Sequence, residues 1–358
     1  MRRYVALYFV IAFFLTSIIG GSVFTTYSQF IAEGPLLEKK EVYIPKGKSL
    51  KRIAALLYKE GVISSPSVFI LGVRAAGNAD KIKAGEYSFP KGASSKMVML
   101  ILASGQTYIR KFKVPEGLSS YQIVQLMNNA KGLTGTVDRL PKNGSLLPDT
   151  YHYSYGDTKA DMIVRMKNAM DRTLVEVWAK RAEGLPFKTP KEAVILASVV
   201  EKETALKKER PLIASVFVNR LNKGMKLQSD PTVIYALTDG RYDMKRALTY
   251  KDLRLESLYN TYYVKGLPRG PISNPGRAAL EAVLNPADTK NLYFVANGKG
   301  GHTFSETYEA HKKNVKVWRS INKKVSQKAK SSVNALKPKE NSEKSLKIDK
   351  EKSNTDKK

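Results

Sequence analysis

The stretch from Thr189 to Thr204, TPKEAVILASVVEKET, shows most clearly how this chain folds. Thr189 can cap a helix, Pro190 suits the first helical position, and Glu192 completes a capping box. The residues that follow are almost all apolar, which predicts a largely buried helix. This helix ends in the charged segment EKET. A carboxylate therefore comes directly after small and apolar side chains, on a helix that is expected to be buried.

Glu201 is the carboxylate that the helical period places on the buried face. At 3.6 residues per turn it shares a face with Ala197 and Ser198. Desolvation disfavours the charged form and raises a carboxyl pKa, as a general acid at neutral pH requires. The other interpretation is that position 201 is simply where the helix reaches solvent. Glu203 points roughly 200° away around the helix and cannot easily face the same bond.

The composition excludes several classes of chemistry. The chain has 358 residues, of which 42% are hydrophobic, so it can build real cores. It has no cysteine, which excludes disulfides and thiol catalysis, and its three histidines form no HExxH spacing. We therefore expect neither a metal site nor a cofactor. The net charge of +29 would raise nucleic acid as a partner, but the N-terminus argues against it.

The N-terminus predicts a membrane anchor. Residues 4–24 carry no charge and match the roughly 20 residues that a helix needs to cross a bilayer. Arg2 and Arg3 precede them, so the positive-inside rule places residues 1–3 in the cytoplasm and the rest outside. A cleaved signal peptide is the alternative, because residues 20–22 are small, but there is no A-x-A site. Outside the cytoplasm genomic DNA is not a plausible target, whereas anionic lipid or an acidic wall polymer is.

Two similar segments follow. Residues 41–108 predict a small α+β module, and residues 109–182 predict a second α+β module with a connecting helix. Both contain, in order, a strand, a P-x-G turn, a serine cap and an amphipathic helix, and the turns begin at Pro45 and Pro115. Chance similarity of two strand–turn–helix units is the alternative to a repeat. The I/V-P-x-G-x-S pattern resembles LysM-like modules, which bind glycans that contain N-acetylglucosamine.

Residues 183–318 predict a mixed α+β domain with a polar and aromatic cleft. Its final helix is expected at about 305–318, and residues 319–358 predict a disordered basic tail. Asn and Gln suit sugar hydroxyls and acetamides, and Tyr suits ring faces. The candidate cleft residues are Gln228, Asp230, Tyr259, Asn260 and Tyr262. Asp230 precedes Pro231 and is also placed to cap a helix.

A carboxylate is the best catalyst that this chain offers. Ordinary glycoside hydrolysis needs two carboxylates that face one bond, and Asp230 is the only other obvious candidate. One carboxylate is enough if the substrate supplies its own nucleophile. A single Glu can then protonate the leaving oxygen and afterwards accept the nucleophile's proton.

Four ordered motifs resemble one family, the YceG-like endolytic murein transglycosylases. They are AVILASVVEKET, VNRLNKGMKLQSDPTVIYAL, YNTYYVKGLPRGPISNPG and YFVANGKGGHTF, and the resemblance covers roughly residues 42–318. The family cleaves the MurNAc–GlcNAc bond of nascent peptidoglycan without water: the 6-hydroxyl of MurNAc attacks C1 and leaves a 1,6-anhydro end. The resemblance implies Glu201, the first Glu of the E-K-E-T motif, as the catalytic residue. One departure is Asn143-Gly144, where the family usually has Glu-Gly.

These features together predict a single-pass enzyme of the inner membrane whose catalytic domain faces the periplasm. It would be a lyase that limits the length of peptidoglycan strands, with synthases or division proteins as possible partners and no nucleic acid. One alternative is a peptidoglycan-binding scaffold without catalysis. The other is a true hydrolase, a muramidase that uses Asp230 as the second carboxylate.

Overall fold

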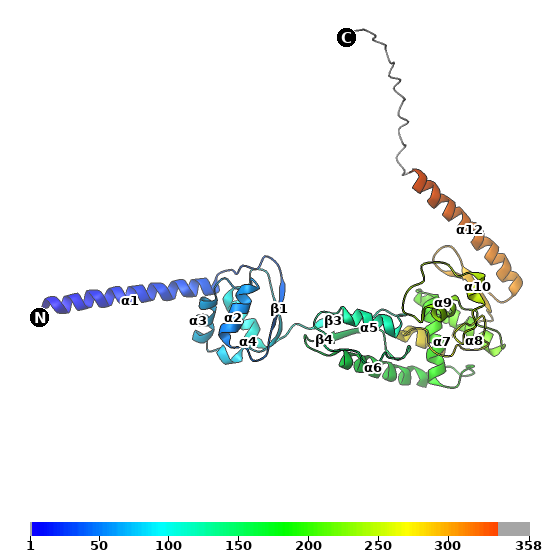
Figure 1. Ribbon diagram of the computed structural model, residues 1–358, viewed down its shortest axis with the longest axis horizontal. Helices are drawn as coiled ribbons and strands as arrows, with labels where there is room; N and C mark the ends of the chain where they lie inside the picture. Colours follow the sequence, from blue (N-terminus) through cyan, green and yellow to red (C-terminus); the bar gives the residue numbers. More distant parts are fainter. Residues whose placement is uncertain (1, 336–358) are drawn as a thin grey trace, which may run out of the picture. The chain divides into compact units, whose positions relative to one another are not determined.

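The computed structural model describes residues 2–335, with side chains from 5 to 323 (Figure 1). The chain divides into two compact units, one up to Ala287 and one from Asp288 onward. Helices alternate with three separate two-stranded antiparallel sheets, so the predicted mixed α+β class is confirmed. Residue 1 and residues 336–358, most of the predicted basic tail, lie outside the described residues.

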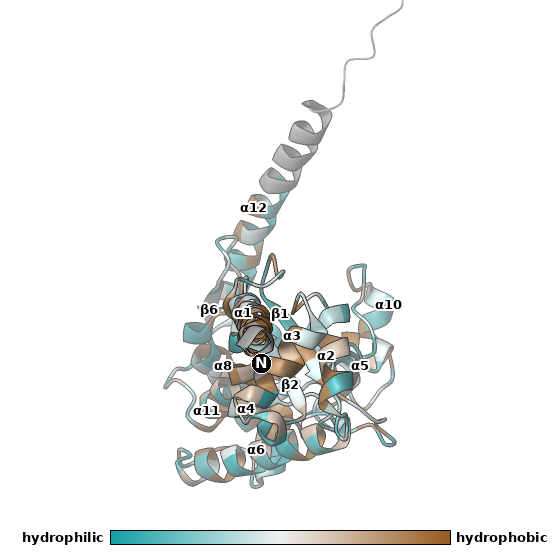
Figure 2. Cartoon of the chain, turned by 90° about the vertical axis from the view of Figure 1, so that its left-hand side faces the viewer, coloured by the Kyte–Doolittle hydropathy of each residue, from teal (hydrophilic) through white to brown (hydrophobic). Residues whose placement is uncertain are grey.

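The chain begins with α1 (Arg2–Ile31), whose residues Val5–Ile31 form a helix long and apolar enough to cross a membrane. In Figure 2 its ribbon is largely brown, the colour of hydrophobic residues. The last turn of α1 behaves differently from the rest. Phe30 is buried in the first module, and its ring occupies the space that a Cβ on Gly72 would need. The predicted apolar span is therefore compatible with a single membrane anchor that ends inside the protein core.

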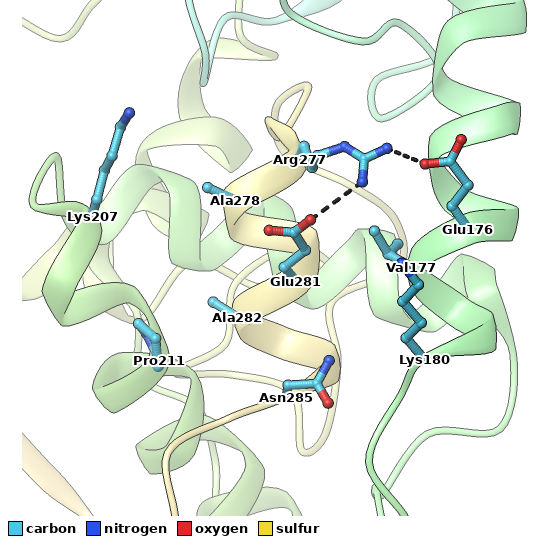
Figure 3. A pocket seen from close by; sticks show the side chains of 10 residues that line it. All are labelled: Glu176, Val177, Lys180, Lys207, Pro211, Arg277, Ala278, Glu281, Ala282 and Asn285. Carbon is cyan, nitrogen blue, oxygen red and sulfur yellow. Dashed lines mark hydrogen bonds and ion pairs between the residues drawn. The ribbon is translucent and has the colours of Figure 1, made fainter.

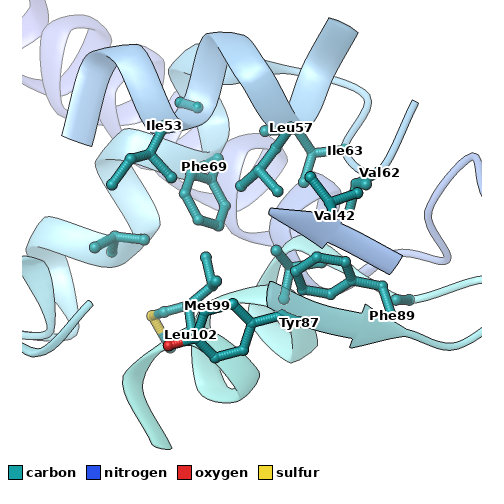
Figure 4. Close-up of a cluster of buried hydrophobic side chains, with 14 of the residues drawn as sticks. Val42, Ile53, Leu57, Val62, Ile63, Phe69, Tyr87, Phe89, Met99 and Leu102 are labelled. Atoms are coloured by element: carbon teal, nitrogen blue, oxygen red, sulfur yellow. The ribbon is translucent and has the colours of Figure 1, made fainter. Parts of the chain in front are cut away.

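The first module packs three helices on one two-stranded antiparallel sheet. Strands β1 (Lys40–Ile44) and β2 (Gly85–Phe89) are antiparallel. The helical elements are α2 (Leu50–Lys59), α3 (Pro66–Ala75), η1 (Ala79–Lys81) and α4 (Ser95–Ser104). The apolar faces of the helices and strands close one core around Leu57, Phe69 and Tyr87 (Figure 4).

The second module repeats the strand–turn–helix order that the sequence indicated. Strand β3 (Arg110–Lys113) pairs with β4 (Thr150–Tyr153), and α5 (Ser120–Asn128) and α6 (Lys159–Ala179) pack on this pair. The two serine caps differ. Ser119 forms a full capping box at α5, whereas Ser49 precedes α2 without a side-chain hydrogen bond.

A buried ion pair joins the two modules. Both guanidinium nitrogens that face Glu86 donate to it, Nε of Arg110 at 2.6 Å and Nη2 at 2.7 Å. Glu86 is almost fully buried, so breaking the pair would leave an uncompensated charge inside the protein. Tyr43 of the first module also stacks on Tyr155 of the second, with ring centroids 4.3 Å apart. These contacts restrain the first module against the second.

Packed helices follow within the same unit. They are α7 (Pro190–Glu203), η2 (Lys207–Glu209), α8 (Arg210–Asn222), α9 (Asp230–Thr238), α10 (Tyr250–Leu253) and α11 (Arg277–Leu284). Helices α7, α8 and α11 pack against one another, and α6 packs on α11. Helix α7 begins with the predicted capping box of Thr189 and Glu192, and its residues from Ala193 to Glu201 are buried except for Ile195.

The second unit contains the hairpin β5 (Tyr293–Ala296) and β6 (His302–Ser305) followed by α12 (Tyr308–Ala335). The expected end of the last helix at about 318 is wrong, since α12 continues to Ala335. Lysine and alanine are good helix formers, so a Lys-rich composition does not by itself end a helix.

Candidate active site

Helix α7 delivers two glutamates to one pocket of about 360 Å³. The pocket is lined by residues 201–205 at the end of α7, by Arg210 of α8, and by Glu116 and Gly117 of the second module. Glu203 is the last residue of the helix, because Thr204 turns to an extended conformation. The two carboxyl groups therefore lie close in sequence, yet each meets a different set of partners.

Glu201 is held in a buried ion pair. Arg210 Nη2 donates to it at 2.7 Å, and the backbone N–H of Gly276 donates to its other oxygen at 2.9 Å. Burial raises the pKa of Glu201, while Gly276 and Arg210 act in the opposite direction. The carboxyl group of Glu201 thus has a donor at each oxygen and little freedom to move.

Arg210 connects Glu201 to the second module. Its Nη2 also donates to Glu116 at 2.8 Å, whereas its buried Nε and Nη1 have no partner among the described residues. A Cβ on Gly276 would overlap the Glu116 side chain, so a larger residue there would displace Glu116 from this position. The positive charge of one arginine, shared by two carboxylates, balances part of the negative charge of the glutamates that line the pocket.

Glu203 lies in a different environment. Ser229 Oγ donates a hydrogen bond to its carboxyl group. Burial raises the pKa of Glu203 to about 7, and the negative charge of Asp230 adds to the shift. Its position at the carboxyl end of α7 also disfavours a negative charge there. Near neutral pH this group therefore exchanges a proton readily, as general acid–base catalysis requires.

The segment that follows α8 positions the hydroxyl next to Glu203. Ser229 N–H donates to Thr261 Oγ1 at 2.9 Å, and the hydroxyl oxygens of Thr232 and Thr261 are also 2.9 Å apart. Gln228 has a φ of 49°, a left-handed conformation that side chains seldom adopt. Such strain persists where the surrounding structure fixes it and is common at functional sites. Both features hold the Ser229 side chain against Glu203.

The structure brings some of the predicted cleft residues to Glu203. Gln228 and Asp230 flank Ser229, and Tyr262 Oη donates to Asp230 Oδ1 at 2.7 Å. The interpretation of Asp230 as a helix cap is wrong: α9 begins at Asp230, and Ser229 occupies the capping position without a side-chain hydrogen bond. Asp230 instead remains exposed next to the site.

The other two predicted cleft residues lie elsewhere. Asn260 is fully buried, and its amide donates to the backbone oxygens of Leu253 and Leu255. It shapes its own loop. Tyr259 packs against Tyr235 and lines a second, larger pocket. Sequence reasoning missed Ser229, Arg210 and Glu116, because only the fold brings these residues to α7.

A third hollow is less suited to chemistry. It has a volume of about 460 Å³ and lies between α6, α8 and α11. Figure 3 shows Arg277 between Glu176 and Glu281, with all three side chains exposed. Exposed ion pairs of this kind contribute little energy. The glutamate pocket at the end of α7 is therefore the candidate active site.

Comparisons with known proteins agree with the motifs. The sequence matches the YceG-like family over residues 42–317. An endolytic murein transglycosylase of Bacillus subtilis is 34% identical over 303 residues, which cover 76% of this chain and 82% of that protein. One of Streptococcus pneumoniae is 29% identical over 321 residues, which cover 76% and 57%.

A crystal structure of a yceG-like protein from Listeria monocytogenes is 33% identical, with a TM-score of 0.49, and the match covers 77% of this chain and 98% of that one. The family match includes both modules, the glutamate pocket and the β5–β6 hairpin. The chain belongs to the YceG-like family.

Proposed function

We propose that this protein is an endolytic murein transglycosylase that cleaves the MurNAc–GlcNAc bond within peptidoglycan strands and leaves 1,6-anhydro ends. Family membership supports the substrate and the reaction class. The observation that carries the chemistry is a glutamate at the end of α7 whose pKa is about 7.

Glu203 fits the role of general acid better than Glu201, the residue that the resemblance implied. Glu201 has its two oxygens occupied by Arg210 and Gly276. Burial raises the pKa of Glu201 as well, but Arg210 at 2.7 Å and the Gly276 N–H oppose that shift and hold the carboxyl group on both sides. Glu203 has a single neutral donor, Ser229, and a pKa near neutrality. Glu201 would then hold the end of α7 in place.

The reaction needs only one carboxyl group. Protonated Glu203 gives its proton to the glycosidic oxygen as the bond to C1 breaks. The 6-hydroxyl of the same MurNAc forms a new bond to C1, and the Glu203 carboxylate takes up the proton that this hydroxyl loses. Atoms and charges balance without water, and Glu203 returns to its starting state.

Matched amide variants test the assignment on purified peptidoglycan. We expect Glu203→Gln to lower the rate of anhydro-muropeptide release about 10²–10⁴-fold, the usual contribution of a general acid. Glu201→Gln should lower it less and keep the pH dependence of the wild type. Glu183→Gln, on an exposed loop, controls for the loss of one charge. A wild-type rate in Glu203→Gln, with the large loss in Glu201→Gln, would return the role to Glu201.

The hydrolase alternative gains one supporting observation, since Asp230 lies close enough to Glu203 to raise its pKa. Two nearby carboxyl groups are what hydrolysis requires. Mass spectrometry of the products separates the two reactions, because a hydrolysed end is one water heavier than an anhydro end. Reducing ends in place of anhydro ends would exclude the transglycosylase mechanism. Binding to peptidoglycan without any cleavage product would favour the scaffold.

The placement of the enzyme in the cell is also part of this proposal. Helix α1 suits a single anchor, with Arg2 and Arg3 on the cytoplasmic side and the remaining chain in the periplasm. Protease digestion of intact spheroplasts should then remove the catalytic domain. Glycan binding by the LysM-like residues 41–108 is a further proposal, and a pull-down of this module on peptidoglycan tests it.

A further inference from the structure

A second pocket, which we call the tyrosine pocket, is larger than the glutamate pocket, and Glu203 does not line it. Its volume is about 760 Å³, and it is lined by parts of α5, α6, α7 and α9 and by the loops 140–145 and 269–271. Pockets of roughly 300–1,000 Å³ are typical of small-ligand sites. Residues that are far apart in the sequence converge here, which is the usual arrangement of a binding site.

One wall of the tyrosine pocket is held by a fixed amide. Asn143 Nδ2 donates to Tyr235 Oη at 2.8 Å, and Asn143 Oδ1 accepts from Ser120 N–H at 2.7 Å. Tyr235 in turn packs on Tyr259, with ring centroids 4.8 Å apart. Burial raises the pKa of Tyr235 to about 12, so it is a neutral hydroxyl at physiological pH. This wall offers rigid aromatic faces and no charge.

The rim of the pocket is positive. Lys142, Lys191 and Arg269 line it with exposed side chains, and none of the three forms an ion pair within the described part of the chain. Two exposed aspartates, Asp171 and Asp239, also line it, and Asp239 is paired with Arg241 at 3.4 Å, so the three cations outnumber the two acids. Val194 and Ile195 supply an apolar floor. The pocket therefore suits a ligand that combines carboxylates with small apolar groups.

We propose that the tyrosine pocket binds the peptide stem that hangs from MurNAc, whose alanine methyls and free carboxylates match the floor and the rim. This inference rests on the proposed function. Ile195 and Glu203 are eight residues apart on α7, which is about 12 Å along the helix. Three or four extended residues span roughly 10–14 Å. A stem attached to the sugar at Glu203 therefore reaches the pocket, whereas the bare lactyl carboxylate of a stripped strand does not.

Asn143→Asp is the sharpest test, because it adds one negative charge without changing the volume. The carboxylate still accepts from Ser120, and the hydroxyl of Tyr235 can turn to donate to it. We expect the affinity of the full-length protein, in detergent micelles, for a synthetic stem tripeptide to fall roughly tenfold. Arg269→Gln should weaken binding similarly, and both losses should shrink at high salt. Asn128→Asp, an exposed position on α5, is the matched control and should bind like the wild type.

Cleavage provides the second measurement. Wild-type enzyme should cleave stem-bearing strands faster than strands stripped by an amidase, and Asn143→Asp should lower this ratio of rates. Failure of the wild type to bind the tripeptide at millimolar concentration, or equal affinity in wild type and Asn143→Asp, would overturn the proposal. Binding of stripped strands that Asn143→Asp weakens, with no binding of the tripeptide, would assign the pocket to the glycan. If neither kind of strand yields an anhydro end, the proposed transglycosylase function is refuted. The tripeptide measurement still tests whether the tyrosine pocket binds the stem.

Discussion

Glu201 and Glu203 are only two positions apart on α7, but they contact different residues: Arg210 and Gly276 for Glu201, and Ser229 for Glu203. The helical period correctly predicted that Glu201 lies on the buried face. It could not predict that Arg210, from another helix, would meet Glu201 there. Nor could it predict that the helix ends at Glu203, whose carboxyl group accepts a hydrogen bond from Ser229. Side-chain burial is a local property of a helix, but the charge of a site depends on distant segments.

The pKa of Glu203 predicts how the rate depends on pH. The first step needs the protonated carboxyl, so kcat/KM should be constant below pH 7 and fall about tenfold for each pH unit above it. Steady-state rates of strand cleavage between pH 5 and 9 measure this fall in kcat/KM. The same fall above pH 7 should persist in Glu201→Gln. A profile that rises through pH 7 would mean that Glu203 acts first as a base.

The same shift predicts a cost in stability. The pKa of Glu203 rises from its ordinary value of 4.5 to about 7 on folding, so the folded chain binds this proton more tightly than the unfolded chain. The stabilisation is complete below about pH 4.5 and is lost as the pH rises through 7. Glu203→Gln should therefore be more stable than the wild type at pH 8, by on the order of 1–3 kcal/mol, and equally stable at pH 4. Urea unfolding at the two pH values provides the comparison, and an equal difference at both would contradict the shift.

At the scale of elements, local signals were enough to predict α7. Thr189, Pro190 and Glu192 marked its start, and the described helix begins at Pro190 with the full capping box. The repeated strand–turn–helix units were also recognisable from their turns. The long-range contacts were not. Asn274 is fully buried and joins three segments: its amide donates to Leu118 and Ser120, and its oxygen accepts from Leu146 N–H. No local pattern identifies those partners.

The capping box should matter for the whole site, because α7 carries both glutamates. Thr189→Ala removes the oxygen that accepts from Glu192 N–H and should lower the free energy of unfolding by about 0.5–2 kcal/mol. Chemical denaturation measures the loss. Thr136→Ala, which removes only an exposed contact to Asp138, is the control and should change stability by less than about 0.5 kcal/mol. Equal losses in the two variants would show that the cap is dispensable.

At the scale of the molecule, the anchor and the first module share one core. Phe30 is the last apolar side chain of α1 that enters this core, against Gly72 of α3. A chain that lacks residues 2–24 keeps this contact, so it should be released from membranes and melt at the temperature of the intact protein in detergent.

Phe30→Ala tests the shared core. Removing a buried phenylalanine leaves a cavity and typically costs 3–5 kcal/mol. We expect hydrogen exchange in the first module to accelerate strongly in this variant, with little change in α7. Phe24→Ala, on the exposed part of α1, is the matched control and should leave exchange unchanged. Unaltered protection in Phe30→Ala would mean that the helix and the module are independent.

The amide of Asn143 has a chemical consequence beyond binding. Its neighbour Gly144 has no side chain to hinder its backbone nitrogen, which can attack the side-chain amide, release ammonia and form a succinimide that water then opens to aspartate or isoaspartate. The hydrogen bonds to Ser120 and Tyr235 restrain the amide from turning toward that nitrogen. Asn274, by contrast, precedes Pro275, which has no N–H to attack. Deamidation at Asn143 would add a further negative charge to the tyrosine pocket, on the wall that carries none at synthesis, so this charge would increase with the age of each molecule.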